Sequence, residues 1–262
     1  MDPGLRRDDK SELLDPKIMN EFATIDDKLK RLHAFRPINS KVMESILEDL
    51  RLRYTYNSNA IEGNTLSISE TKAVIEKGIT IKGKSLTEHL EAINHHKAID
   101  MLINFVQNQQ ELNLQMILDF HGIIMKSVDD EWAGRFRNGR VLISGAQNKP
   151  TEPNLIYAEM QQLADYIESS QDVHPITRAA RIHLDFVKIH PFFDGNGRTA
   201  RLIMNLVLMQ AQYPITVIDK EIRANYCDAI EEYCLDGNDS AFTVIIKNAV
   251  ENSLDTYLNV LE

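Results

Sequence analysis

Residues 190–201 read HPFFDGNGRTAR and lie between two segments of helical character. Before them, residues 175–189 carry an apolar stripe at helical spacing, and after them residues 202–212 are apolar on almost every side. A simple turn between two buried helices does not require a histidine, an aspartate, two glycines and two arginines together. We therefore interpret this stretch as a ligand-binding site at the joint of two core helices.

The glycines and arginines of this stretch indicate that the ligand is an anion. Gly195 and Gly197 allow positive φ angles and a close approach of the backbone, so that N–H groups at the start of the next helix can point at one ligand. Arg198 and Arg201 are three apart and share a face of the first helical turn, where both can donate paired hydrogen bonds to phosphates. The arrangement suits a di- or triphosphate better than a single carboxylate.

Two further side chains add a metal ligand and a base. Asp194 lies at the rim of the loop and can bind a Mg²⁺ ion, which proteins usually hold with one or two carboxylates and with substrate oxygens. His190 precedes the loop, and an imidazole with the ordinary pKa of about 6.5 is largely neutral near pH 7 and able to accept a proton. The stretch thus predicts a polyphosphate site with a base at its edge.

The composition limits the partners of the chain. Its 262 residues carry a formal net charge of −10 and are 43% hydrophobic, so the chain can bury a core but lacks the basic face that binding to nucleic acid or an anionic membrane requires. There is no apolar leader, and the uncharged run at residues 202–218 is interrupted by polar residues and a proline. We expect a cytoplasmic protein with a local anion site.

Apolar residues recur at helical spacing along most of the chain, which predicts an all-α fold. Residues 139–154, GRVLISGAQNKPTEPN, are the exception, because β-type residues alternate there with glycine, asparagine and proline. We expect one small β-hairpin, with strands at 141–143 and 149–151. We divide the chain into an N-terminal helical layer at residues 1–65 and a core at residues 66–262, packed as one unit.

Residues 78–85, GITIKGKS, match the phosphate-binding pattern GxxxxGK[ST] by letter. A phosphate-binding loop of that class must follow a buried strand. The residues before this one instead open with a capping box, Ser67-x-x-Glu70, and continue as an amphipathic helix. We expect an ordinary joint between two helices here.

A zinc site formed by His89, His95 and His96 is a weaker alternative. The spacing of six residues puts His89 off the helical face of His95, and no cysteine is nearby. We expect these histidines to lie on the polar face of a long helix.

HPFFDGNGRTAR resembles the signature of the Fic family, HxFx[DE]GNGRxxR, at every specified position. The resemblance extends to a helical core around this joint and to a hairpin flap before it. It implies transfer of AMP from ATP to a Ser, Thr or Tyr hydroxyl of a target protein, with Mg²⁺ as cofactor. The roles that it implies are His190 as general base, Asp194 as Mg²⁺ ligand, Gly195, Asn196 and Gly197 as the hole for the α- and β-phosphates, Arg198 at the β-phosphate and Arg201 at the γ-phosphate.

A second resemblance lies in residues 57–64, NSNAIEGN, where Ser58, Glu62 and Gly63 fit the family's inhibitory pattern [ST]xxxE[GN]. In related proteins this glutamate pairs with the second arginine, here Arg201, so that the γ-phosphate cannot settle productively. A hundredfold restraint needs about 2.8 kcal/mol, whereas an exposed ion pair gives about 0.2–1 kcal/mol. We therefore expect the contact to be partly buried and bidentate.

Further predictions concern the acceptor, the base of the nucleotide and the partners. Val141, Leu142 and Ile143 could form a strand edge that pairs with an extended segment of the target protein. Tyr226 is a candidate to stack on the adenine, and packing in the core is its alternative role. A homodimer is expected by analogy with related proteins.

Two other functions stay open at this point. The same site could remove AMP from a modified protein, with Glu62 positioning a water molecule. Alternatively, the chain could be a nucleotide-binding regulator with little turnover, in which the interaction surface matters more than the reaction.

Overall fold

The structure, a computed structural model, describes residues 21–143 and 145–262, so the first twenty residues of the predicted N-terminal layer lie outside the described ranges. Within these ranges the protein is helical and contains no strand, which confirms the predicted helical class. The helices are α2 (Ala23–Ala34), α3 (Ser40–Ile61), α4 (Ile68–Lys77), α5 (Leu86–Gln107), α6 (Leu114–Ile124), α7 (Ile156–Ser169), α8 (Pro175–Ile189), α9 (Asn196–Gln210), α10 (Arg223–Asp236) and α11 (Ser240–Leu261), with short 3-10 turns η1 (Pro153–Leu155) and η2 (Lys220–Ile222).

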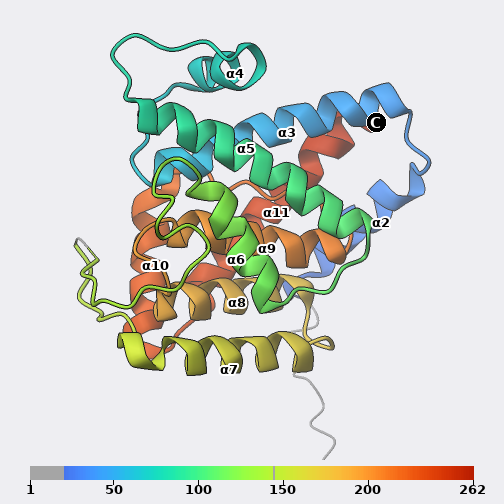
Figure 1. The fold of residues 1–262 in the computed structure, drawn as a ribbon. Helices are drawn as coiled ribbons and strands as arrows, with labels where there is room; N and C mark the ends of the chain where they lie inside the picture. Colours follow the sequence, from blue (N-terminus) through green and yellow to red (C-terminus); the bar gives the residue numbers. More distant parts are fainter. Residues whose placement is uncertain (1–20, 144) are drawn as a thin grey trace, which may run out of the picture.

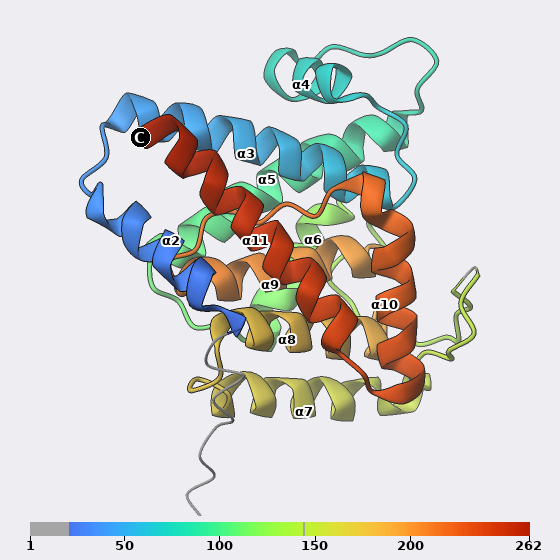
Figure 2. The same ribbon diagram turned by 180° about the vertical axis from the view of Figure 1, so that it is seen from behind.

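Helices α8 and α9 pack against each other at the centre of the molecule. In Figure 1, α3 and α5 lie on one side of this pair, α7 lies beyond α8 on the other side, and α6 crosses in front. Figure 2 shows α10 and α11 on the opposite face, where α11 packs against α2 and α8. The end of α3 comes close to the start of α9, so the two stretches singled out in the sequence meet.

Local capping explains where the helices around residues 67–86 begin and end. Ser67 and Ser85 each accept a hydrogen bond from the backbone N–H three residues later, and a glutamate at that position returns the bond, so both form capping boxes. Gly78 closes α4 with φ of 62°, a conformation that glycine adopts without strain. The stretch that matches a phosphate-binding loop by letter is therefore a joint between two helices, as predicted.

A continuous apolar core joins the helices on both sides of residue 65. Residues 198–208 of α9 are all buried, and Leu206 belongs to the same cluster as Ile25 of α2 and Leu50 of α3. The boundary at residue 65 stays a prediction. None of the helices in the described part of the chain combines the length and the apolar character needed to cross a bilayer.

The predicted hairpin is the main error in the fold prediction, because residues 141–143 and 149–151 form no strand. The ends of this segment do meet, since the Arg137 guanidinium donates to the carbonyl of Gly139 at 2.8 Å and to that of Thr151 at 2.6 Å. Those carbonyls are thereby withdrawn from a ladder, and Pro150 offers no N–H to one. A two-stranded hairpin without a face to bury is marginal in any case.

The three histidines of α5 do not form a metal site. His89 accepts a hydrogen bond from the Ile81 backbone N–H at 2.8 Å, His96 contacts Arg51, and no group of three potential ligands in the described ranges could hold a metal ion. The predicted polar face is wrong for His89 and His95, which are buried. Other helices, including α3, α4, α6 and α9, pack around α5 and cover most of its sides.

Candidate active site

His190 ends α8 in a left-handed conformation, with φ of 52° and its backbone N–H bonded to the Phe186 carbonyl at 3.0 Å. Such a conformation is uncommon for a residue other than glycine and turns the chain sharply out of the helix. The side chain is half-buried. Burial, together with the smaller effect of the Arg137 charge, lowers the pKa of His190 to about 4. The imidazole is therefore neutral near pH 7 and able to accept a proton.

The loop between α8 and α9 is held by its own polar groups. The Asn196 side chain accepts from the Phe192 N–H and donates to the Phe192 carbonyl, both at 2.9 Å. Asp194 accepts from the Gly195 N–H at 2.6 Å through one carboxylate oxygen. Asn196 thus contributes its side chain to the loop, which leaves its backbone N–H for a ligand.

The start of α9 offers backbone donors to an anion. No side chain caps this helix, and its first turn closes only with the bond from Thr199 N–H to the Gly195 carbonyl at 2.9 Å. The earlier N–H groups have no partner within the helix, and the helix dipole adds partial positive charge at this end. A Cβ on Gly195 would lie 3.1 Å from the Met125 sulfur, and the φ of 74° is one that other residues adopt only with strain, so this position favours glycine.

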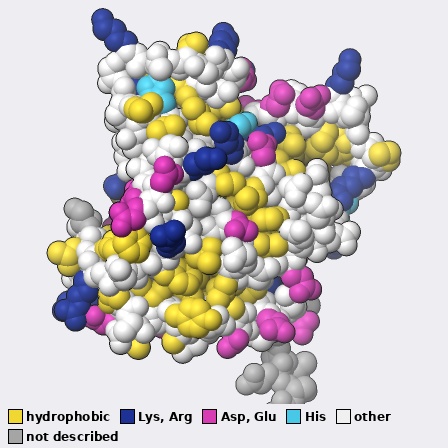
Figure 3. Space-filling model, viewed as in Figure 1, with side chains coloured by type: hydrophobic (Ala, Val, Ile, Leu, Met, Phe, Trp, Pro, Cys, Tyr) yellow, Lys and Arg dark blue, Asp and Glu magenta, His cyan; other side chains and the backbone are white. Residues whose placement is uncertain are grey.

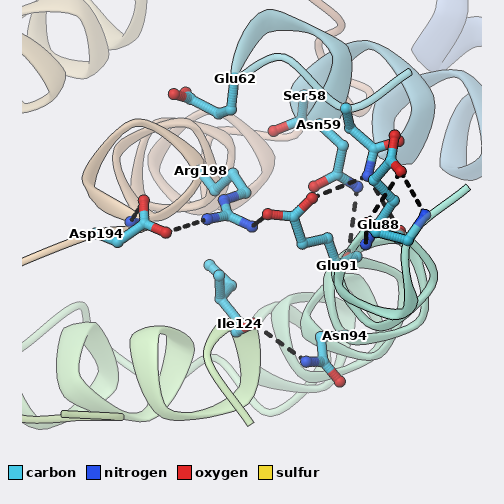
Figure 4. A network of polar contacts seen from close by, with 12 residues as sticks. Ser58, Asn59, Glu62, Glu88, Glu91, Asn94, Ile124, Asp194 and Arg198 are labelled. Atoms are coloured by element: carbon cyan, nitrogen blue, oxygen red, sulfur yellow. Dashed lines mark hydrogen bonds and ion pairs between the residues drawn. The ribbon is translucent and has the colours of Figure 1, made fainter. Parts of the chain in front are cut away.

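Arg198 is buried between two carboxylates, as Figure 4 shows. Its Nη1 donates to Glu91 Oε1 at 3.0 Å, and its Nη2 donates to Asp194 Oδ2 at 3.3 Å. The other Glu91 oxygen accepts from Asn64, two residues after Glu62, at 2.9 Å. The Glu91 carboxylate therefore links the first arginine to the segment that follows α3.

Arg201 is also buried, and its guanidinium is shared among several groups. Nε donates to Ser58 Oγ at 3.0 Å, and Nη2 donates to the Ser58 carbonyl at 2.8 Å and to Glu62 Oε1 at 2.7 Å. The predicted ion pair with Glu62 is present, and its arginine is buried whereas the Glu62 side chain is partly exposed. The prediction of a bidentate contact is wrong. Ser58 occupies the paired donors, so Glu62 reaches the arginine through one oxygen.

The Glu62 carboxylate lies directly over Gly197. A Cβ on Gly197 would collide with Glu62 Oε1 and would lie 3.1 Å from Arg201 Nη1. Glu62 follows the last residue of α3, and its side chain is 38% exposed, so it enters the site from the edge. A negative group thus already occupies the space above the second glycine of the loop.

Tyr226 lies in the core and presents no ring face to a ligand. It is 3% exposed, its hydroxyl accepts from Arg201 Nη1 at 3.1 Å and contacts His183 Nε2 at 2.8 Å, and its ring lies against Phe242. Of the two predicted roles, the structure favours packing. The residue instead helps to orient Arg201.

Three site residues were missed from the sequence, namely His121, Arg137 and Glu91. His121 stacks on Phe192 with ring centroids 3.6 Å apart, accepts from Gly134 N–H at 3.0 Å and donates to the Asp194 carbonyl at 3.0 Å. Burial lowers the pKa of His121 to about 4, which agrees with one nitrogen acting as an acceptor. For His121, the only signal in the sequence was a buried-type position held by a histidine within the mostly apolar α6.

The segment after Arg137 projects from the molecule beside the site. Leu142 is 96% exposed, and Leu155 and Tyr157 nearby in the chain are 46% and 66% exposed. Figure 3 shows hydrophobic side chains at the left edge of the molecule, where this segment projects in Figure 1. Val141 and Ile143 are half-buried, so Leu142 is the most exposed of the three predicted docking residues.

Comparison with known proteins places these features in a family. A model of the Fic/DOC family matches residues 111–208. The chain is 33% identical over 239 residues to the protein adenylyltransferase Fic of Drosophila willistoni, a match that covers 90% of this chain and 47% of that protein. It is 30% identical over 253 residues to the protein adenylyltransferase fic-1 of Caenorhabditis elegans, with coverage of 95% and 48%. The chain spans about half the length of the curated relatives that it matches.

Solved structures agree with this assignment. The structure of Fic-1 from C. elegans has a TM-score of 0.79 at 30% identity, over 93% of this chain and 74% of that chain. A Fic domain containing signaling protein from Bacteroides thetaiotaomicron has a TM-score of 0.82 at 27% identity, over 92% of this chain and 96% of that chain. With helices in the same arrangement and the complete signature at the joint of α8 and α9, the chain belongs to the Fic/DOC family.

Proposed function

We propose that this protein transfers AMP from ATP to a Ser, Thr or Tyr hydroxyl of a protein, and that Glu62 holds the activity down. The observation that carries the proposal is the start of α9, where uncapped N–H groups, two buried arginines and a neutral histidine surround one space. The relatives that match 90% or more of the chain are named protein adenylyltransferases, which supports the same reaction class.

In the proposed reaction the acceptor hydroxyl attacks the α-phosphorus of ATP, its proton passes to His190, and pyrophosphate leaves. The backbone N–H groups of Asn196 and Gly197 would hold the α- and β-phosphate oxygens, while Arg198 and Arg201 would bind the outer phosphates. Phosphoryl chemistry of this kind depends chiefly on positioning and charge stabilisation. Proton transfer to a placed base typically contributes about 10²- to 10⁴-fold in rate.

The residues present fit a magnesium ion. Asp194 is 64% exposed at the mouth of the loop, and one of its oxygens is only loosely held by Arg198 at 3.3 Å. A single exposed carboxylate beside a polyphosphate site is the usual protein contribution to Mg²⁺ binding. When bound, Mg²⁺ would neutralise phosphate charge, and Asp194 would be its protein ligand.

Inhibition by Glu62 is supported by where its carboxylate lies. It covers Gly197 and pairs with Arg201, which would otherwise be available to the γ-phosphate. A fully exposed ion pair supplies about 0.2–1 kcal/mol, and this pair is exposed on the Glu62 side only. The remaining restraint would come from occupancy, because phosphate oxygens and a carboxylate cannot share the same space over the glycine.

Removal of AMP is the second candidate function, and the exposure of Glu62 favours it. Its side chain reaches the site yet stays 38% exposed, so it could hold a water molecule against a bound AMP group. The two candidates differ in what the Glu62→Gly variant does. Loss of the glutamate should increase transfer in the first case and abolish removal in the second.

Mass spectrometry tests the proposed function. The Glu62→Gly variant, incubated with ATP and Mg²⁺ alone and in a host lysate, should yield peptides whose Ser, Thr or Tyr carries one AMP. Adducts of phosphate alone would indicate a kinase. Absence of any adduct, with ATP binding intact, would favour removal of AMP or a regulatory role.

The partners in this proposal are a target protein and a second copy of the chain. The loop around Leu142 is the proposed docking segment for the target. Ile79 and Leu86, 47% and 71% exposed beside α4, are apolar residues that a homodimer could cover. Sedimentation of the native chain beside Leu86→Glu tests the dimer, which should be lost in the variant and would be unsupported if both sediment alike.

A further inference from the structure

Arg137 is a buried cation whose partners are main-chain carbonyls. It is 3% exposed, and its guanidinium donates to the carbonyls of His190 at 2.8 Å, Gly139 at 2.8 Å and Thr151 at 2.6 Å. Its own backbone N–H donates to the Pro191 carbonyl at 2.9 Å. No carboxylate pairs with it among the described residues. One side chain therefore holds both ends of the segment 139–151 and the residue that carries the imidazole.

The cost of burying a charge explains why an arginine is needed at position 137. A buried charge is costly unless its hydrogen bonds are satisfied, and carbonyl oxygens satisfy these donors without cancelling the charge. The planar fork of arginine can reach three carbonyls in fixed directions, which the ammonium group of lysine cannot reproduce. The His190 carbonyl belongs to a residue in the left-handed conformation, so the bond from Arg137 bears on the geometry of that turn.

We propose that Arg137 is a positioning residue that couples the segment 139–151 to His190, so that seating of the acceptor protein and placement of the base are set together. This rests on the proposed function. A misplacement of about 1 Å in a reacting group can lower a rate by about 10²-fold. The coupling would let a docked target segment hold the imidazole at its hydroxyl.

The chain supplies a matched control in Arg178. That arginine is also buried and also donates to a carbonyl, that of Ile167 at 2.7 Å, and to Ser170 Oγ at 3.1 Å. Burial lowers the pKa of both arginines. Arg178 lies in the first turn of α8 and donates to residues at the end of α7, at the other end of α8 from His190, so replacing it by lysine imposes a similar burial cost without touching the site.

The kinetic test compares Arg137→Lys and Arg178→Lys in the Glu62→Gly background. We expect Arg137→Lys to lower the rate of labelled AMP transfer onto the protein itself by about 10- to 100-fold while calorimetric affinity for ATP and Mg²⁺ changes less than about twofold. Arg178→Lys should lower the melting temperature without changing transfer. Equal loss of transfer and ATP binding in Arg137→Lys, or equal loss of transfer in both variants, would overturn the proposal.

A second readout follows the imidazole and does not depend on transfer. The charged groups that face His190 are Arg137, Glu62 and Asp194. In Arg137→Gln the nearest positive charge is gone, so the His190 resonance, assigned by its loss in His190→Ala, should titrate at higher pH than in the parent. Arg178→Gln should leave the titration of the His190 resonance unchanged. An unmoved titration in Arg137→Gln would contradict the coupling even if the protein transfers no AMP.

Hydrogen exchange keeps the proposal testable if the Arg137 variants do not fold. In the native chain, the hydrogen-bonded amide of Gln147 in the segment 139–151 and those of His190 and Phe192 should open together as one unit in mild denaturant, because one guanidinium ties the two parts of the chain. Independent opening of the two segments would overturn the proposal. Joint opening with no AMP transfer in any variant would instead leave the coupling intact and remove the proposed function.

Discussion

The carboxylate of Glu62 occupies the space in which any side chain at Gly197 would begin. The two residues are far apart in the sequence, yet the end of α3 brings them into contact at the start of α9. Gly197 lies within the first turn of a helix and has no positive φ, so glycine is not needed there for backbone conformation. We attribute the glycine at this position to the Glu62 carboxylate, which leaves no room for a side chain.

Replacing Gly197 by alanine should therefore cost less stability when Glu62 is absent than when it is present. In the native chain the new methyl group would collide with Glu62, and the variant should lose stability. In the Glu62→Gly background only the contact with Arg201 Nη1 at 3.1 Å remains, so the same change should cost less stability, and the preference for alanine over glycine in a helix offsets up to about 1 kcal/mol of that cost. A double-mutant cycle measured by denaturant unfolding checks this. Equal effects in both backgrounds would mean that the two residues do not touch.

Glu62→Gly should raise AMP transfer more than Glu62→Gln does. Glutamine removes the charge that pairs with Arg201 but keeps most of the bulk over Gly197, whereas glycine removes both. If occupancy is the larger part of the restraint, the glutamine variant should stay close to the native rate. Initial rates with α-labelled ATP measure the difference, and equal activation in both variants would assign the restraint to charge alone.

His190→Ala should abolish transfer while calorimetric binding of ATP and Mg²⁺ stays within a few fold of its parent. The pH profile gives an independent check, because the lowered pKa of His190, about 4, predicts a flat transfer rate from about pH 6 to 8. The rate should fall only as the imidazole becomes protonated at more acidic pH. Joint loss of transfer and binding in the variant would mean that His190 is a structural residue.

The free energy of unfolding should also decrease at acidic pH, where buried histidines become protonated. His121 and His190 have pKa values lowered to about 4, first of all by burial, whereas an unfolded histidine titrates near its ordinary value of 6.5. Between these values the unfolded state binds more protons, so the free energy of unfolding rises with pH and is lost as pH falls from about 6.5 toward 4. His121→Asn should flatten this dependence in urea unfolding across that range, and an unchanged slope would contradict the lowered pKa.

Glu91→Gln should increase the Mg²⁺ concentration that transfer requires. Without the Glu91 charge, Arg198 would be compensated by Asp194 alone, and the stronger pairing would compete with the metal. A Mg²⁺ titration of ATP binding by calorimetry, with Glu251→Gln as a control in a remote pair with Lys28, tests this. If Glu91→Gln behaves like the control, Arg198 does not depend on Glu91.

The site residues that could be predicted from the sequence are those that lie close together in the chain. Residues 190–201 carry base, metal ligand, glycines and arginines within one joint, and helical spacing on both sides placed that joint between core helices. The capping box of Ser67 and Glu70 likewise marked a helix start, because a cap acts within three residues. Local patterns of this kind need no knowledge of the rest of the chain.

Contacts made across the fold could not be predicted in the same way. Glu91 meets Arg198 from α5, and Arg137 meets His190 from a connecting segment, each through packing that no local spacing records. The hairpin prediction failed for the same reason, since the carbonyls of Gly139 and Thr151 bond to a side chain and not to a strand. The bidentate prediction for Glu62 overlooked that Ser58 would use the paired donors of Arg201.

Transfer of label from ATP is the decisive measurement for the proposed role of His190 in AMP transfer. The Glu62→Gly variant and the Glu62→Gly, His190→Ala double variant are each incubated with Mg²⁺ and ATP labelled at the α- or the γ-phosphate. We expect protein-bound label from the α-position only, and only when His190 is present. Label from the γ-position, or α-label that persists without His190, would contradict this expectation.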